Sequence, residues 1–184
     1  MPRRELTFER KVERVWYVVQ VVGGQEHAVI EQIEKLVSST TYKSCFIPQY
    51  EVKKRYSGVW KYRQEVLFPG YVFVDTKTPD KFRKQLNKVS RMTKLLHDEN
   101  EHFIPLADDE KTIISAFIGD TDHVMKMSEG IINGDEVVIL KGPLMNHLGL
   151  VKKIDRHKRL AYLELKMCGR PVTIKAGLEI VKKY

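Results

Sequence analysis

Two groups of side chains in this sequence have the types and spacing needed for binding chemistry, and the first group is aromatic. Segment 66–74 reads Val-Leu-Phe-Pro-Gly-Tyr-Val-Phe-Val, in which residues typical of a strand are interrupted by a Pro-Gly break. Alternation along the strand would place Tyr71 and Phe73 on one face, beside that bend. This face could dock an apolar partner, or both rings could fill the protein's own core, since most large aromatic residues are buried.

The second group is cationic and lies near the C-terminal end. Its members can neutralise phosphates, and they surround one predicted strand and its turns: Lys152, Lys153, Arg156, His157, Lys158, Arg159, Lys166 and Arg170. The tripeptide Gly169-Arg170-Pro171 resembles half of an AT-hook core, in which an extended arginine enters a groove, although a barrel turn could use it too.

The distribution of charge favours a polyanionic partner for the C-terminal part. The chain of 184 residues carries a net charge of +8, of which residues 1–127 hold +3 and residues 128–184 hold +5. A solvated surface would give the same charge without a partner. The sequence has no run of 18 apolar residues and no apolar signal-peptide core, so we expect a cytoplasmic protein.

The sequence lacks the usual patterns of catalytic and metal-binding sites. The six histidines are scattered, Gly23-Gly24 lacks the Lys-Ser/Thr of a phosphate loop, and helix capping explains Asp108-Asp109. Cys45 and Cys168 lie far apart, and we expect both to be reduced and partly buried, without zinc. We therefore expect no enzymatic activity, no metal and no cofactor.

The elements that must position these side chains begin with an α+β arrangement. We expect strands at 16–22, 45–52, 66–74 and 93–96, an exposed basic hairpin arm at 53–63, and helices at 25–38, from Pro79 and from Asp108. This order predicts an antiparallel sheet covered by helices.

Short strands separated by turn residues follow this first part. We expect them at 136–140, 149–154, 160–165, 172–175 and 178–181. Five such strands predict a small SH3-like β-barrel, which is only marginally stable alone. The predicted organisation is an N-terminal extension at 1–14, an α+β domain at 15–118, a linker at 119–128 and a barrel at 129–184.

Several motifs occur in an order that characterises a known family. They are Trp16-Tyr17-Val18-Val19-Gln20, Gly24 at the start of a helix, Leu67 to Val74, Gly134 to Ile139, Gly142-Pro143 and Gly149-Leu150-Val151. In this order they resemble the NusG family of transcription elongation factors, and the last three resemble that family's KOW barrel. The resemblance covers about residues 15–183. It implies a first domain that binds RNA polymerase and a barrel that contacts something else.

The resemblance also implies which residues bind the polymerase. In the family an aromatic-rich concavity packs on the polymerase clamp helices, and it corresponds here to Gln20, Phe68, Pro69, Tyr71 and Phe73. Some specialised relatives use a His-Thr-Thr segment to contact the opposite jaw of the polymerase. The matching positions here are Arg83, Lys84 and Gln85, which depart from that pattern. This cationic helix could equally lie beside upstream DNA or be solvated.

The barrel departs from that of the housekeeping factor. Its loop reads Leu144-Met145-Asn146-His147-Leu148, without the phenylalanines that contact termination factor Rho and a ribosomal protein. With the cationic residues, this departure resembles LoaP-type antiterminators, specialised NusG paralogues that bind an RNA hairpin in the nascent leader.

The resemblance therefore implies a monomeric antitermination factor. It would bind RNA polymerase and a structured RNA hairpin, and it would suppress pausing and termination. One alternative is a general NusG elongation factor whose barrel binds proteins, namely Rho or a ribosomal protein. Another is a ribosome-associated structural protein.

Overall fold

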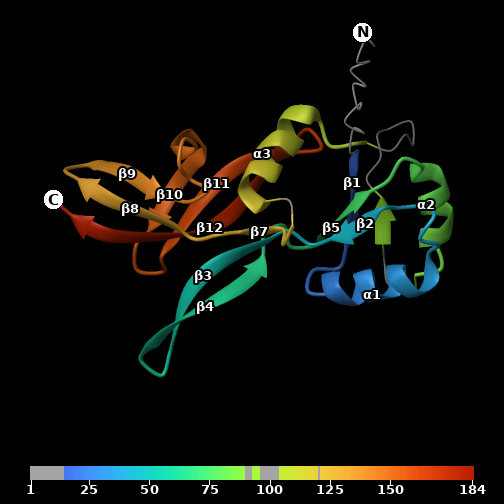
Figure 1. The fold of residues 1–184 in the computed structure, drawn as a ribbon, viewed down its shortest axis with the longest axis horizontal. Coiled ribbons are helices and arrows are strands. Elements are labelled where there is room, and N and C mark those ends of the chain that lie inside the picture. The colour runs from blue at the N-terminus through green and yellow to red at the C-terminus, as the bar shows by residue number, and fades with distance from the viewer. Residues whose placement is uncertain (1–14, 90–92, 96–103, 120) are drawn as a thin grey trace, which may run out of the picture.

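An antiparallel sheet with two helices on one face forms the first part of the chain (Figure 1). The computed structural model describes residues 15–89, 93–95, 104–119 and 121–184, so the expected N-terminal extension at 1–14 lies outside the described residues. The strands are β1 (Trp16–Val21), β2 (Ser44–Phe46), β5 (Tyr71–Asp75) and β6 (Thr93–Leu95), in the order β2-β5-β1-β6. The β-branched residues of β1 and β5 favour the two central strands.

Each face of this sheet has its own core. Helices α1 (Glu26–Leu36) and α2 (Pro79–Leu86) bury an apolar stripe against one face, where they meet Val72 and Val74 of β5. Phe73 points to the opposite face, together with Trp16 and Phe46. The alternation expected along β5 is therefore present, and both of its faces are covered.

The predicted hairpin arm is present and longer than expected. Strands β3 (Gln49–Tyr56) and β4 (Val59–Val66) pair antiparallel around Ser57-Gly58. Strand β7 (Val124–Met125) pairs parallel with the start of β3. Segment 119–128, expected to be a linker, thus contributes a strand to the three-stranded sheet β4-β3-β7.

Five strands make up the C-terminal part, which we call the barrel domain (residues 128–184). They are β8 (Ser128–Asn133), β9 (Glu136–Lys141), β10 (Val151–Asp155), β11 (Leu160–Met167) and β12 (Arg170–Lys183), in the order β10-β11-β12-β8-β9, with a short helix η1 (Leu148–Leu150) before β10. The α+β fold class with a five-stranded C-terminal domain is confirmed.

The strands of the barrel domain differ from the predicted strands in two places. The strands expected at 172–175 and 178–181 are one strand, because Gly177 pairs with Leu160 inside the ladder and makes no turn. Strand β8 was not predicted, because Gly130 interrupts its apolar pattern.

Helix α3 (Asp108–Ile118) ends the first domain and lies between the sheet β2-β5-β1-β6 and the barrel domain (Figure 1). Its Ile114, Phe117 and Ile118 belong to one buried cluster that also contains Phe73 of the first sheet and Leu163 of β11. The two domains therefore share a hydrophobic core in this arrangement.

Candidate functional site

The turn between β4 and β5 is fixed by hydrogen bonds to three other segments. Leu67 N donates to Pro48 O at 2.8 Å, Val21 N donates to Gly70 O at 2.8 Å, and Gly70 N donates to a Glu26 carboxylate oxygen at 2.7 Å. Gly70 has φ +85°, a conformation that a side chain would strain. The Pro-Gly break thus sets the direction of a rigid turn.

Glu26 is a positioning residue that the sequence analysis missed. It lies in the first turn of α1 on the buried side of the helix. Burial favours a higher pKa for its carboxyl, but hydrogen bonds from backbone amides, that of Gly70 first, outweigh burial and hold the pKa below its ordinary value. The signal was available, since Glu26 shares the helical spacing of buried Val29 and Ile33.

The expected polymerase-binding residues fall into an accessible and an inaccessible set. Gln20 lies directly opposite Tyr71 across β1 and β5, and Gln20 and Pro69 are exposed while Tyr71 is half-buried. Phe68 and Phe73 are only 1% and 0% exposed, with ring centroids 5.4 Å apart. In this arrangement neither ring can reach a partner.

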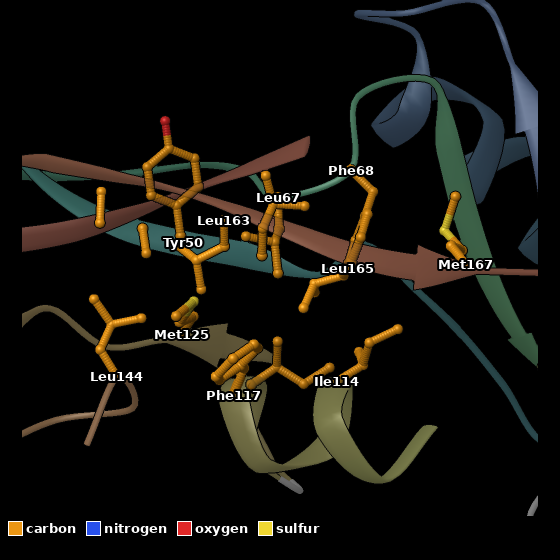
Figure 2. Close-up of a cluster of buried hydrophobic side chains, with 14 of the residues drawn as sticks. Tyr50, Leu67, Phe68, Ile114, Phe117, Met125, Leu144, Leu163, Leu165 and Met167 are labelled. Carbon is orange, nitrogen blue, oxygen red and sulfur yellow. The ribbon is translucent and has the colours of Figure 1, made fainter. Parts of the chain in front are cut away.

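The barrel domain and α3 cover Phe68. Figure 2 shows Leu67 and Phe68 on the side of the turn that faces Leu165 and Met167 of β11. Ile114 and Phe117 of α3 approach the same cluster from the other side (Figure 2). We call Leu67 and Phe68 the masked patch, because residues of β11 and α3 cover them.

A small cavity flanks the masked patch. It measures about 270 Å³ and lies between the turn, represented by Leu67 and Pro69, and residues Thr173, Ile174 and Lys175 of β12. The turn therefore lies beside β12 at Leu67 and Pro69.

Glu110 fastens α3 to the barrel domain. Its carboxylate accepts hydrogen bonds from the backbone amides of Cys168 at 3.0 Å and Gly169 at 2.9 Å, and from that of Ala107 at 3.2 Å. Glu110 is buried, and it shares the helical spacing of Ile114 and Phe117. This residue too was not predicted from the sequence, although a carboxylate on an apolar helix face indicates a specific partner.

The hairpin arm contacts the barrel domain through charges. Lys53 of β3 forms an ion pair with Glu179 of β12, and this hydrogen bond raises the pKa of Lys53. Arg159 donates to the same carboxylate at 2.6 Å, and its guanidinium lies 3.8 Å from the ring centroid of Trp60 in β4. Arg159, expected in an RNA site, is therefore part of the contact between the domains.

Backbones of the two domains meet at Gly177. A methyl group added there would collide with the backbone carbonyl of Glu51 in β3, so only glycine allows β12 to lie this close to the arm. The side chain of Glu51 also accepts a hydrogen bond from Met127 N at 3.2 Å.

The structure divides the expected RNA-binding residues into two groups. Lys153, Arg156, His157 and Lys158 are exposed at or beside the β10–β11 turn, and we call them the turn group. Lys166 and Arg170 are exposed at the opposite end of β11, which places them roughly 25 Å away for an eight-residue strand. Lys152 lies nearer this second group and is 3.8 Å from Glu164.

The residues expected to contact the opposite jaw of the polymerase lie apart from the masked patch and from the turn group. Arg83 and Lys84 are exposed on α2, which packs on the sheet face opposite Phe73. Gln85 accepts a hydrogen bond from Ser38 N at 2.7 Å and so helps to join α2 to the end of α1.

Other chemical features of the described residues are limited. Cys45 and Cys168 are free thiols of intermediate exposure, as expected. Within the described ranges, no helix is long and apolar enough to cross a membrane, and no three His, Cys, Asp or Glu residues are grouped to hold a metal.

The fold and the sites together define a two-domain factor, with an α+β domain that carries an aromatic patch and a small basic barrel. A family model described as "Transcription termination factor nusG" matches residues 14–118, and a KOW motif model matches residues 133–164. The first match covers more than half of the chain, so this chain belongs to the NusG family. NusG-family transcription factors are non-enzymatic, which confirms the expectation that this protein is not an enzyme.

Curated relatives match along almost the whole chain. The "Transcription termination/antitermination protein NusG" of Buchnera aphidicola (subspecies Acyrthosiphon pisum) is 22% identical over 172 residues, which is 91% of this chain and 95% of the relative. The protein of the same name from Campylobacter jejuni is 27% identical over 175 residues, or 91% of this chain and 96% of the relative. This protein is a NusG-like transcription termination/antitermination factor.

A solved structure on domain interaction in Thermotoga maritima NusG is similar in fold. It superimposes with a TM-score of 0.55 at 23% identity and covers 90% of this chain and 94% of that chain.

Proposed function

We propose that this protein is a processive antitermination factor of the LoaP type. Its first domain binds RNA polymerase at the clamp helices, and its barrel domain captures an RNA hairpin in the nascent leader. Capture of the leader raises the local concentration of the attached first domain near the polymerase. Binding to the elongating conformation then suppresses pausing and termination, without covalent chemistry.

The turn group is the observation that carries the RNA part of the proposal. Arg156, His157 and Lys158 are exposed on a tight β10–β11 turn, and Lys153 precedes them on β10. Slender cationic side chains on a turn suit A-form RNA, whose major groove is too deep and narrow for a whole helix. Lys166 and Arg170 would contact a separate part of the RNA, given their distance along β11.

Polymerase binding requires the barrel domain to move. Membership in the NusG family implies a polymerase-binding first domain, and we assign the contact to Gln20, Pro69 and Tyr71 together with Phe68 and Phe73. Phe68 is buried against α3 and β11, and Phe73 packs on Phe68 with ring centroids 5.4 Å apart, so clamp binding needs an open arrangement in which α3 and the barrel domain release Phe68. The solved structure that describes domain interaction in Thermotoga maritima NusG is similar in fold, and it supports the contact between the first domain and the barrel domain proposed here.

Arg83, Lys84 and Gln85 are assigned a weaker, second contact. Arg83 and Lys84 are exposed on the far face of the first domain, where they would meet the opposite jaw or upstream DNA. We place the protein in the cytoplasm as a monomer.

The proposal is tested by transcription with purified polymerase on a template that encodes a leader hairpin and a downstream terminator. The protein should increase read-through only when the hairpin is present. Lys153→Ala with Arg156→Ala should abolish this effect, because it removes two exposed cations from the turn group. Lys182→Ala with Lys183→Ala removes the same charge from exposed positions near the chain end and is the matched control.

Salt dependence provides a second readout. Loss of two phosphate contacts should reduce the slope of log affinity against log salt by about 1.8, at roughly 0.9 per neutralised phosphate. Equal read-through with and without the hairpin would contradict the proposal.

A second candidate function has one observation in its favour. The barrel domain exposes Val138 and Leu140 on β9 and Met145 and Leu148 in the following loop. Apolar side chains gathered on one small domain suit a protein partner, as in a general elongation factor whose barrel binds Rho or a ribosomal protein. Pull-down of such a protein by the barrel, lost on Leu140→Ser, would favour this alternative.

A further inference from the structure

The hairpin arm and the barrel domain enclose a groove whose lining shares only Lys158 with the turn group. It has a volume of about 430 Å³, within the range of ligand sites, and it lies between β3–β4 on one side and β11–β12 on the other. The arm provides Lys53, Lys54, Arg55 and Trp60, and the barrel domain provides Lys158, Tyr162 and Lys175. We call it the arm groove.

The arm groove is strongly cationic. Five of its lining side chains are lysine or arginine, of which Lys53 pairs with Glu179 of β12, and Glu65 is its single lining carboxylate. Glu65 is already engaged, since it pairs with Lys54 and accepts a hydrogen bond from the Tyr50 hydroxyl at 2.7 Å. Burial favours a higher pKa for Glu65, but these two partners outweigh it and lower the pKa, so the carboxylate is ionised and neutralised by Lys54 near neutral pH.

Aromatic rings occur on both walls of the arm groove. Trp60 comes from the arm and is 38% exposed, and Tyr162 comes from the barrel domain. The guanidinium of Arg159 lies 3.8 Å from the Trp60 ring centroid, and Lys153 Nζ lies 5.9 Å from that of Tyr162. Alternating flat rings and cations are the means by which proteins hold unpaired bases and their phosphates together.

Register along the arm explains why these groups meet. Arg55 lies opposite Trp60, and Lys53 lies opposite Tyr62 in the β3–β4 ladder, so these four side chains share one face of the arm. The other face also contributes to the groove through Lys54 and Glu65, whereas Tyr56 and Lys61 of that face do not line it. The arm therefore brings Arg55 and Trp60 from one face and Lys54 from the other to the groove.

We propose that the arm groove binds a short single-stranded segment of nucleic acid, with a base stacked against Trp60 and phosphates held by the cations of both domains. A duplex would keep its bases stacked on one another and out of reach of the tryptophan, so the ligand is unpaired. The inference rests on the proposed nucleic-acid role of the protein and adds a first-domain contribution to it. A strand held by both walls stabilises the closed arrangement, and it therefore competes with clamp binding at the masked patch.

The chain contains its own reporter for this site. It has two tryptophans, of which Trp16 is 5% exposed and Trp60 is 38% exposed. Addition of an oligouridylate or an oligothymidylate of about ten nucleotides to the full chain should quench the fluorescence of Trp60 by stacking. Comparison of the two oligomers shows whether RNA, DNA or both are accepted, and either result supports the groove.

Variants test the site by anisotropy of labelled oligomers. Trp60→Ala should weaken binding by at least about fivefold, from the usual strength of base–aromatic stacking. Arg55→Ala should weaken it and lower the salt slope by about 0.7, the value for one phosphate on a single strand. Tyr56→Ala and Lys61→Ala, at arm positions that do not line the groove, are the matched controls and should bind like the wild type.

Two results would overturn the inference. One is wild-type affinity in both Trp60→Ala and Arg55→Ala, and the other is equally tight binding of polyglutamate, which would show a site for acidic peptides. Failure here is distinct from failure of the proposed function. Hairpin binding that depends on Arg156 but not on Trp60 would remove the groove alone, since Arg156 does not line it.

Discussion

Replacement of Gly177 by alanine should separate the two domains without unfolding either. The added methyl would meet the carbonyl of Glu51 in the first domain, so β12 and β3 cannot keep their present distance. Within the barrel, Gly177 lies in a regular ladder opposite Leu160, where alanine is tolerated. The perturbation therefore acts on the contact between domains.

The size of the effect follows from the masked patch. Leu67 and Phe68 are 2% and 1% exposed, and burial of each is worth about 1.5–3 kcal/mol. If ordering of the interface offsets part of that sum, closure is favoured by about 3 kcal/mol, and about 1% of molecules are open. A partner that binds only the open form therefore has an apparent affinity of about 1% of its affinity for fully open protein. The alanine variant should therefore bind polymerase up to about 100-fold more tightly.

Two measurements check this prediction. Biolayer interferometry with core polymerase gives the affinity, and hydrogen exchange over residues 66–74 reports release of the patch without any partner. Gly149→Ala is the matched control, because nothing lies within 4 Å of a side-chain carbon at that position. Unchanged affinity and unchanged exchange in a folded Gly177→Ala protein would refute the reasoning that the barrel masks the docking surface.

Three further predictions concern the same interface and the turn beside it. Glu110→Ala should destabilise the closed arrangement by about 1–3 kcal/mol, because the backbone amides of Cys168 and Gly169 lose their charged acceptor, and faster hydrogen exchange at 167–170 would show it. Burial, and next the charge of Glu110, raises the pKa of the Cys168 thiol to about 11. At pH 8 the reaction of Cys168 with a disulfide reagent should therefore be slow, its rate should rise tenfold per pH unit, and domain opening should accelerate it up to about 100-fold. The measurement uses Cys45→Ser, which leaves Cys168 as the sole thiol. Gly70→Ala should lower thermal stability by about 1–2 kcal/mol through strain at φ +85°, and an unchanged melting temperature would contradict that account.

The sequence alone determined most of the elements and their chemistry, although strand β8 and the continuity of β12 were not predicted from it. Strand β5 follows from β-branched and aromatic residues, α1 and α2 from apolar spacing, and the arm from turn residues between basic strands, because these patterns act over a few neighbouring residues. The cationic turn group and the half-buried thiols could be predicted for the same reason.

Only the tertiary structure decided which of these side chains are accessible and which meet. Phe68 has the same local sequence whether it faces a partner or the barrel domain, and its burial depends on residues about a hundred positions away. Arg159 sits beside Lys158 in sequence, yet it turns to Glu179 and Trp60, while Lys166 and Arg170 lie at the other end of β11. Long-range packing selects among contacts that local patterns leave equal, so the masked patch and the arm groove exist only in the folded arrangement.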